Sequence, residues 1–242
     1  MVPPVKSFLA PNPGPITLEG TRTYVVGEDP AAVIDPGPRI ESHISAVAGA
    51  VGRAAEVVIL LTHAHDDHAA AAARLAHRTG ASVHGPGGDH DLTDGQVIHT
   101  SGGDLAAIST PGHARRHFCF HHPATASIFV GDLILGDGDT TWIGEYAGAV
   151  ADYLRSLDRL AALGARRLHP AHGPAIHDPA GTIARFRAHR LERIEQVRRA
   201  VADGHAVTPA IARHVYGPLP PKIRAMAEAS VDAILDYLSG AE

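Results

Sequence analysis

Residues 57–68 read Val-Val-Ile-Leu-Leu-Thr-His-Ala-His-Asp-Asp-His, an unbroken apolar run that leads directly into histidine and aspartate. The run has the length and the β-branched composition of a buried strand. Four potential metal ligands follow it within one short turn, namely His63, His65, Asp67 and His68. In α/β folds, binding sites form beyond the carboxyl ends of such strands. The stretch therefore predicts an α/β protein with a site at the end of this strand.

The residue types in this turn indicate divalent metal. Imidazole nitrogen and carboxylate oxygen are the ligands that zinc and similar ions prefer. Four of them in six positions are too many for one tetrahedral ion if further ligands come from elsewhere, so they favour a pair of ions. The alternative interpretation is a solvated polar loop in a chain that contains 18 histidines. The buried strand that leads into the turn favours the metal site.

Length and composition exclude several classes of protein. A chain of 242 residues that is 45% hydrophobic can form one large domain, or one domain with an appendage. No apolar run approaches the ~20 residues of a membrane span, and the proline-broken amino terminus does not resemble a secretory signal. We therefore expect a cytoplasmic protein. Cys119 is the one cysteine, which excludes an intramolecular disulfide, and a net charge of −5 provides no basic surface typical of nucleic-acid binding.

Hydropathy patterns predict strands and helices in alternation, which indicates a layered α/β architecture. Predicted strands cover 16–26, 31–35, 57–61, 82–84, 97–99, 104–109, 118–120, 127–130 and 167–169. Predicted helices cover 40–51, 69–79 and 149–163, and the pattern is wholly helical from Ala180 onward. We expect a catalytic domain over residues 1–178 and a helical region over residues 179–242.

Three further predicted strands end close to a side chain that can bind metal. These side chains are His113, after the run 105–109, Asp132, after 127–130, and His172, after 167–169. A glycine stands next to each of them and permits tight turns and a close approach of the chain to an ion. Each signal is weak alone, but their order and placement agree with the turn at 62–68.

The motif His63-x-His65-x-Asp67-His68, followed in order by His113, Asp132 and His172, resembles that of the metallo-β-lactamase fold hydrolases. The resemblance implies an αββα sandwich with the site along one edge of the two sheets. It also implies a first ion bound by His63, His65 and His113, a second bound by Asp67, His68 and His172, and Asp132 as the bridge between them.

Within that superfamily, the chain is most similar to the lactamase-beta-like protein 2 group. The similarity includes Asn12-Pro13-Gly14-Pro15, Gly131–Gly136 and His189-Arg190-x-x-Arg193. In that group the carboxyl terminus is a small winged-helix-like appendage, so residues 179–242 would be a shortened form of it. The group includes endoribonucleases specific for single strands, and related proteins include thioesterases that release polyketides from carrier proteins.

These features predict a hydrolase whose nucleophile is a hydroxide that bridges two zinc ions, with iron or manganese as other possible metals. Two ions ~3.5–4 Å apart can share a hydroxide because they lower the pKa of water toward ~7. We assign catalytic roles to Asp67 and Asp132 in addition to metal binding. The substrate is a phosphodiester in single-stranded RNA, or an ester or thioester of a small or carrier-bound acid.

Two alternatives come from other classes, and the sequence leaves the oligomeric state open. One is a sulfur dioxygenase of the same fold with one iron at these ligands. The other is a non-catalytic module whose carboxyl-terminal helices bind nucleic acid or a protein partner.

Several other residues have two interpretations. Asp35 either orients a ligand histidine or starts a turn as part of Asp-Pro, and the sequence does not separate these. His117 either approaches the substrate or, as we expect, is simply partly buried, and we expect His121-His122 to lie in a turn. The arginines of 185–190 could hold a phosphate backbone, but their helical spacing favours a solvated face with Phe186 inward. Trp142 is expected to pack against the sandwich more than to line a groove.

Overall fold

The structure is a computed structural model that describes residues 5–240. Two five-stranded mixed sheets form its centre, in the orders β1-β2-β3-β4-β5 and β10-β9-β8-β7-β6. The strands are β1 (Lys6–Leu9), β2 (Arg22–Val26), β3 (Ala31–Ile34), β4 (Val57–Leu60), β5 (Ser82–His84), β6 (Val97–Ile98), β7 (Leu105–Ser109), β8 (Phe118–His122), β9 (Ser127–Gly131) and β10 (Arg167–Pro170). The α-helices are α1 (Glu41–Val51), α2 (Asp66–Ala69), α3 (Ala72–Thr79), α4 (Ala149–Ala162), α5 (Pro179–Ala202), α6 (Thr208–Tyr216) and α7 (Pro221–Ser239).

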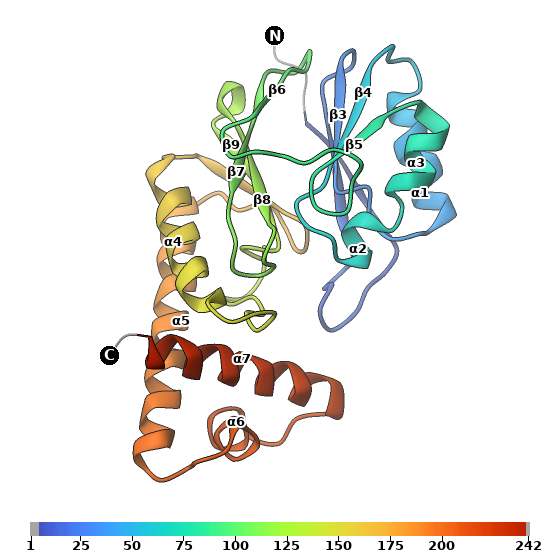
Figure 1. Ribbon diagram of the computed structural model, residues 1–242. Helices are drawn as coiled ribbons and strands as arrows, with labels where there is room; N and C mark the ends of the chain where they lie inside the picture. The colour runs from blue at the N-terminus through green and yellow to red at the C-terminus, as the bar shows by residue number, and fades with distance from the viewer. Residues whose placement is uncertain (1–4, 241–242) are drawn as a thin grey trace.

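The elements form four layers, as Figure 1 shows. Helices α1 and α3 cover the outer face of the first sheet, and α4 and α5 lie against the outer face of the second. The inner faces of the two sheets pack on each other through a cluster that includes Ile34, Leu60, Phe120 and Phe129. The predicted αββα sandwich is therefore confirmed.

Strand β4 shows why its sequence is apolar at every position. Ile59 packs outward in a cluster with Ile44 of α1 and Leu75 of α3. Leu60 packs inward in the cluster between the sheets, which includes Leu105 of β7. A strand covered on both faces has no solvated side, so the alternation of apolar and polar residues disappears.

The parallel strand pairs place their carboxyl ends at one edge of the sandwich. Strand β3 is parallel to β4, with α1 between them in the chain, and β9 is parallel to β10, with α4 between them. The chain leaves this edge at Asp35, at 61–68, at Asp132 and at His172. Residues distant in sequence are thereby brought to one place.

Several local predictions differ from the structure. The helix predicted over 69–79 is divided into the end of α2 and the whole of α3, with a turn at 70–71 between them. Strand β1 was not predicted, because it is an edge strand that pairs only with β2 and has mostly exposed side chains. Strand β2 begins at Arg22 and not at Ile16. The prediction of a turn at His121-His122 is wrong, because both residues pair with β9 at the end of β8.

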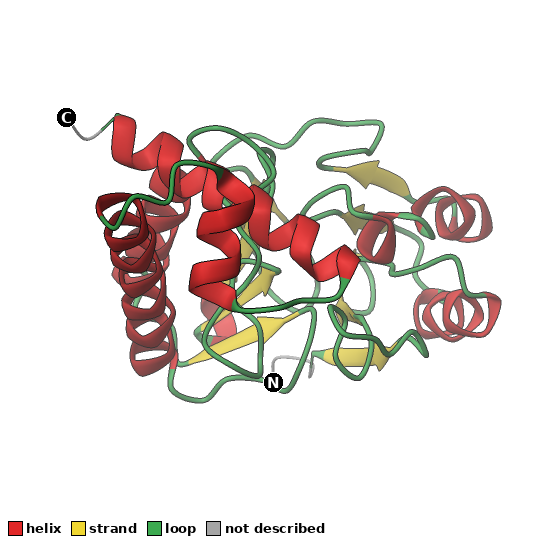
Figure 2. Cartoon of the chain, turned by 90° about the horizontal axis from the view of Figure 1, so that it is seen from below, coloured by secondary structure: helices red, strands yellow, loops and turns green. Residues whose placement is uncertain are grey.

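The carboxyl-terminal region is helical throughout its described part, with no strand between residues 179 and 240. Figure 2 shows α7 crossing the end of the sandwich. Phe186 of α5 and Val231 of α7 belong to the same buried cluster as Leu157 of α4 and Ile128 of β9. The helices thus share a core with the second sheet, and the domain division at residue 178 stays a prediction. No described helix is both long and apolar enough to span a bilayer.

Replacing Phe186 with alanine tests this shared core. The side chain is 1% exposed, so Phe186→Ala should lower the free energy of unfolding by about 3–5 kcal/mol. Leu191→Ala on the same helix is the matched control, since Leu191 is 44% exposed and surface changes stay within about 0.5 kcal/mol. Chemical denaturation followed by circular dichroism measures both, and equal effects of the two changes would contradict a shared core.

Candidate metal centre

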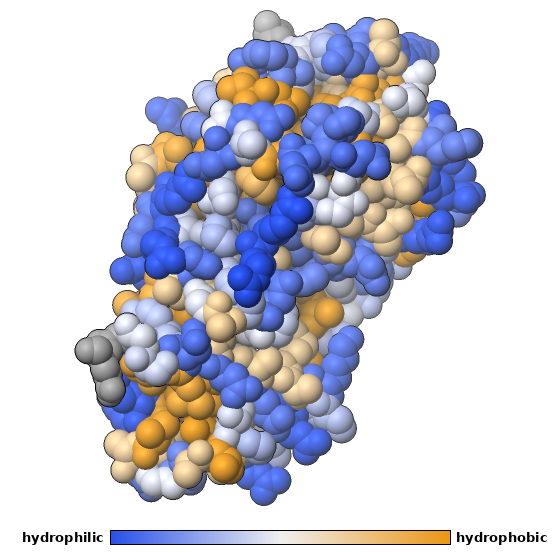
Figure 3. All heavy atoms as spheres, viewed as in Figure 1, coloured by the Kyte–Doolittle hydropathy of each residue, from blue (hydrophilic) through white to orange (hydrophobic). Residues whose placement is uncertain are grey.

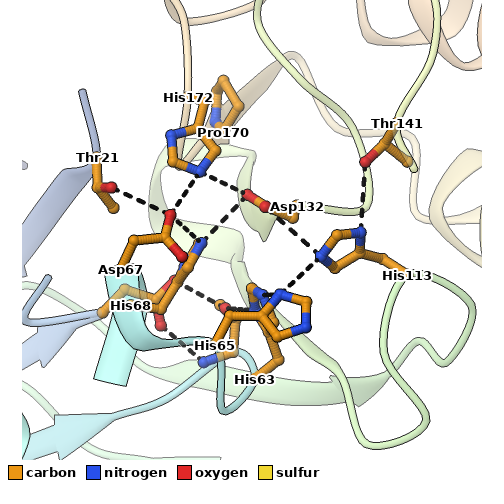
Figure 4. Close-up of polar contacts among 12 residues, drawn as sticks. Thr21, His63, His65, Asp67, His68, His113, Asp132, Thr141, Pro170 and His172 are labelled. Carbon is orange, nitrogen blue, oxygen red and sulfur yellow. Dashed lines mark hydrogen bonds and ion pairs between the residues drawn. The ribbon is translucent and has the colours of Figure 1, made fainter. Parts of the chain in front are cut away.

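The seven predicted ligands lie together at the edge of the sandwich where the strands end (Figure 4). They are His63, His65, Asp67, His68, His113, Asp132 and His172. The turn after β4 carries His63 and His65, and the short helix α2 carries Asp67 and His68. Each of the other three follows β7, β9 or β10, as the sequence predicts.

The first cluster contains three imidazole nitrogens. Nδ1 of His65 lies 2.9 Å from Nε2 of His63 and 3.2 Å from Nε2 of His113. Such distances between nitrogens that can all be lone-pair donors suit a single small cation between them.

The second cluster contains one carboxylate oxygen and two imidazole nitrogens. Oδ2 of Asp67 lies 3.1 Å from Nε2 of His172 and 3.4 Å from Nε2 of His68. Thr21 donates a hydrogen bond of 3.3 Å from Oγ1 to the same carboxylate oxygen.

Asp132 lies between the two clusters. Its Oδ1 is 3.3 Å from Nε2 of His172 and 3.4 Å from Nε2 of His68, whereas its Oδ2 is 3.6 Å from Nε2 of His113. One oxygen therefore faces each cluster, which is the arrangement of a bridging carboxylate.

A glycine permits this placement of Asp132. Gly131 has φ +50°, and a Cβ there would come within 2.7 Å of Oγ1 of Thr62 and 2.8 Å of Nε2 of His117. Any larger residue would displace the turn that presents Asp132.

Hydrogen bonds behind the ligands set their orientation. Nδ1 of His113 donates to the carbonyl of Trp142 at 3.0 Å, and Nδ1 of His172 donates to the carbonyl of Gly20 at 3.1 Å. Because a carbonyl can only accept, these bonds place the proton of each ring on Nδ1 and direct Nε2 at the clusters, where it can bind a metal once it is deprotonated. Partners of this kind fix the tautomer of metal-binding histidines.

Asp35 performs the same function for the turn after β4. It accepts hydrogen bonds from Nδ1 of His68 at 2.8 Å, from the Thr62 amide at 2.8 Å and from the Thr62 hydroxyl at 2.7 Å. The Thr62 hydroxyl oxygen is then free to accept from Nδ1 of His63, 3.0 Å away. Of the two interpretations of Asp35, the structure supports the one in which it orients ligand histidines.

Burial and charge fit a cation at this place. Nε2 of His68 and Oδ1 of Asp132 are buried without a hydrogen-bond partner among the described residues. Burial opposes ionisation of Asp132, but His68 and His172 hold its pKa well below the usual value. Burial likewise opposes the charge of His172, and Asp132 outweighs it and raises the pKa of His172 to about 10. The donor set and the two unpartnered atoms therefore suit divalent metal ions.

A cavity of about 610 Å³ opens from the metal centre toward the carboxyl-terminal helices. Its wall is largely apolar and includes Ile16, Leu18, Leu135, Trp142, Tyr216, Leu219, Ile223 and Met226. Trp142 thus lines the cavity, although the sequence favoured simple packing. Figure 3 shows that apolar side chains also gather on parts of the outer surface over the carboxyl-terminal helices.

The loop 140–143 connects the metal centre to these helices. The carbonyl of Thr141 accepts from Nη2 of Arg190 at 2.9 Å, the Trp142 indole donates to the carbonyl of Met226, and Ser230 donates to the carbonyl of Ile143. Because His113 bonds to the same loop, helices α5 and α7 help to position a ligand. This function of Arg190 was not predicted from the sequence. The one available sequence signal was the motif at 189–193.

His117 is buried, as expected, and it is not among the clustered ligands. Its Nδ1 lies 2.9 Å from Oγ1 of Thr110, and burial holds the pKa of the imidazole well below its usual value.

Asp35→Asn should weaken the second metal position. The change removes the charge that His68 contacts, and loss of such a partner typically lowers metal affinity by about 10–100-fold. Competition titration with a zinc chelator measures the affinity. Asp66→Asn is the control, because Asp66 is an exposed carboxylate next to the ligands, and an equal loss in both variants would contradict the proposed function of Asp35.

Zinc binding should release protons at pH 8. Burial opposes the charge of His172, but Asp132 outweighs it and raises the pKa of His172 to about 10, so this imidazole is protonated at pH 8 in the metal-free protein. A metal binds only the deprotonated nitrogen. Calorimetric titration with zinc in buffers of different ionisation enthalpy should report release of about one proton per chain from His172, and a value near zero would contradict this electrostatic arrangement.

The comparisons with known proteins agree with this geometry. The model of the metallo-beta-lactamase superfamily matches residues 16–91 and 80–172. An atrochrysone carboxyl ACP thioesterase from Aspergillus chevalieri is 33% identical over 99% of this chain and 82% of its own length. A beta-lactamase-like protein 2 homolog from Caenorhabditis elegans is 28% identical over 97% of this chain and 83% of its own.

Solved structures share the fold. A metallo-beta-lactamase family protein from Thermus thermophilus superposes with a TM-score of 0.83 at 22% identity, over 98% of this chain and 93% of that one. A second protein, solved in a di-iron-bound form, gives a TM-score of 0.57 at 27% identity, over 74% of this chain and 98% of that one. From the family match, the similarity to these relatives and the clustered metal ligands, we conclude that the chain belongs to the metallo-beta-lactamase superfamily and is a hydrolase of that fold.

Proposed function

We propose that the protein is a two-zinc thioesterase that releases an acyl group from a carrier-bound thioester. The observation that supports this most is the position of Asp132, with one carboxylate oxygen facing each of two ligand clusters beside an apolar cavity. Two zinc ions at these clusters would supply a hydroxide nucleophile and polarise the attacked carbonyl oxygen.

The chain's own residues prepare the site for this reaction. Asp132 is buried and contributes negative charge between the clusters, while Asp67 has a side chain that is 27% exposed at the cavity. The back-side hydrogen bonds of His113 and His172 keep their Nε2 lone pairs in place. These ligands are therefore oriented before substrate binds, and such preorganisation avoids a cost during the reaction.

A side-chain nucleophile is not supported. Cys119 is fully buried in β8, and burial raises the pKa of its thiol to about 12, so the thiolate is scarcely populated. Ser230 lines the cavity, but its hydroxyl donates to the carbonyl of Ile143. Attack by water activated at the metal centre needs neither residue.

The cavity wall favours a thioester over a phosphodiester. Apolar side chains from the loop at 16–18 and from α7 suit an acyl group better than a polar nucleic-acid backbone. The net charge of −5 gives no general attraction for RNA. One of the relatives is also named as a thioesterase that acts on an acyl carrier protein.

A second candidate is iron chemistry at the same ligands. Imidazole and carboxylate also bind iron, and one of the superposed structures was solved in a di-iron-bound form. The sulfur dioxygenase hypothesis requires one iron, whereas seven candidate ligands lie here in overlapping groups of three, more than one ion needs. That difference favours the two-metal hydrolase.

Asp132→Asn should abolish hydrolysis and reduce metal content. The zinc-loaded protein is assayed on acyl-carrier thioesters, S-lactoylglutathione and single-stranded RNA, with and without chelator. We expect chelator-sensitive thioester cleavage, a loss of at least about 100-fold in kcat/KM in the variant, and no effect of Asp137→Asn, since Asp137 is exposed. Cleavage of RNA alone would replace the thioesterase proposal with a nuclease.

The metal content of the purified protein separates zinc from iron. Elemental analysis should show two zinc ions per chain, in keeping with two clusters that share Asp132. Asp67→Asn should reduce the content toward one ion, because Asp67 contributes to the second cluster alone. One iron per wild-type chain would contradict the two-zinc proposal.

A further inference from the structure

Arg190 of α5 is a buried cation in the wall of the cavity. It is 3% exposed and belongs to the cavity lining together with Arg193. The sequence predicted that the arginines of 185–190 form a solvated face, and for Arg190 that prediction is wrong. Buried arginines normally have an anionic partner, because an uncompensated charge is costly to remove from water.

The contacts of Arg190 leave part of its guanidinium without a partner. Nη2 donates to the carbonyl of Thr141, and the guanidinium carbon lies 5.6 Å from the centre of the Tyr153 ring. Nε is buried and has no hydrogen-bond partner. Among residues 5–240, no carboxylate lies within 4.0 Å of this guanidinium.

Arg193 adds a second guanidinium to the same wall. It follows Arg190 by three residues, so both side chains lie on one face of α5. Its guanidinium carbon lies 4.4 Å from the centre of the Tyr216 ring, and Nη1 donates to Gln196. Within the described chain it also has no ion-pair partner.

His189 also lines this part of the cavity. It supplies no negative charge that could compensate the two guanidinium groups. Burial lowers the pKa of its imidazole, and its Nδ1 is buried without a partner. The carboxylate nearest to it belongs to Asp139, with Oδ1 3.9 Å from Nε2 of His189. The cavity thus has an apolar wall and a cationic one.

We propose that Arg190 and Arg193 form a subsite for an anionic oxygen group of the substrate, a carboxylate or a phosphate. Guanidinium groups bind both anions through charge-assisted hydrogen bonds. Arg190 and His113 bond to neighbouring carbonyls of the loop 140–143. The bound anion therefore lies near the metal centre, where it would select substrates and position the scissile bond.

The anion subsite depends on the proposed function in one respect, which is that the substrate binds in this cavity. It is tested by binding, without any hydrolysis, so that a failed assay of thioester cleavage does not decide it. Trp142 is the one tryptophan of the chain and lines the cavity, so its fluorescence reports occupancy.

The zinc-loaded full chain is titrated with two matched pairs of ligands, hexanoate with hexanamide and hexyl phosphate with hexanol. At least one anion should bind about tenfold or more tightly than its uncharged counterpart. The pair with the larger ratio identifies the carboxylate or the phosphate as the preferred group. Ratios near one for both pairs would overturn the proposal.

Arg190→Gln should reduce the larger of the two affinity ratios, anion over uncharged counterpart, toward the value that the metal ions alone produce. Arg193→Gln should reduce the same ratio about threefold or more. Arg199→Gln is the control, because Arg199 is exposed on the same helix and pairs with Glu195. Zinc content and melting temperature show whether each variant is folded. If Arg190→Gln does not fold, Arg193→Gln decides, and an unchanged ratio in a folded variant overturns the subsite.

Discussion

The carboxylate of Asp132 is the contact on which the metal centre depends. Its oxygens lie between Nε2 atoms of histidines that follow three different strands, β4, β7 and β10. A buried carboxylate requires positive charge nearby. Within the described chain, Asp132 is also the one carboxylate that faces all three of these histidines. Parallel strands that end at one edge make this possible, because the chain turns there beside Gly131, a position that accepts no side chain.

A second set of hydrogen bonds connects the ligands to the surrounding fold and fixes their orientation. Asp35 holds His68 and Thr62, and Thr62 in turn contacts His63. On the other side, the loop 140–143 accepts a hydrogen bond from His113 and is held by helices α5 and α7. The carboxyl-terminal helices are therefore part of the structure that positions the metal ligands, as well as the wall of the cavity.

Membership of the superfamily and the ligand clusters indicate hydrolysis at a metal centre, and we propose that the cavity wall selects the substrate. That wall comes from the loop at 16–18, the loop 140–143 and the helices α5 to α7. Its apolar part suits an acyl group, and its two arginines without ion-pair partners in the described chain suit an anion. A hydrolytic centre common to a superfamily can serve different substrates by changes in such elements.

The sequence by itself identified the candidate ligands that the structure brings together, since each follows an apolar run within a few residues and both features are visible in local patterns. By resemblance it also predicted the αββα layers and the order of the ligands. Only the tertiary structure decided that Asp35 orients His68, that β1 completes a sheet, and that Arg190 is buried in the cavity. Each of these depends on contacts between segments far apart in the chain, which helical or strand periodicity does not encode. The helix face of Arg190 has the pattern of a solvated surface, and the packing of α5 against the loop 140–143 is what removes it from water.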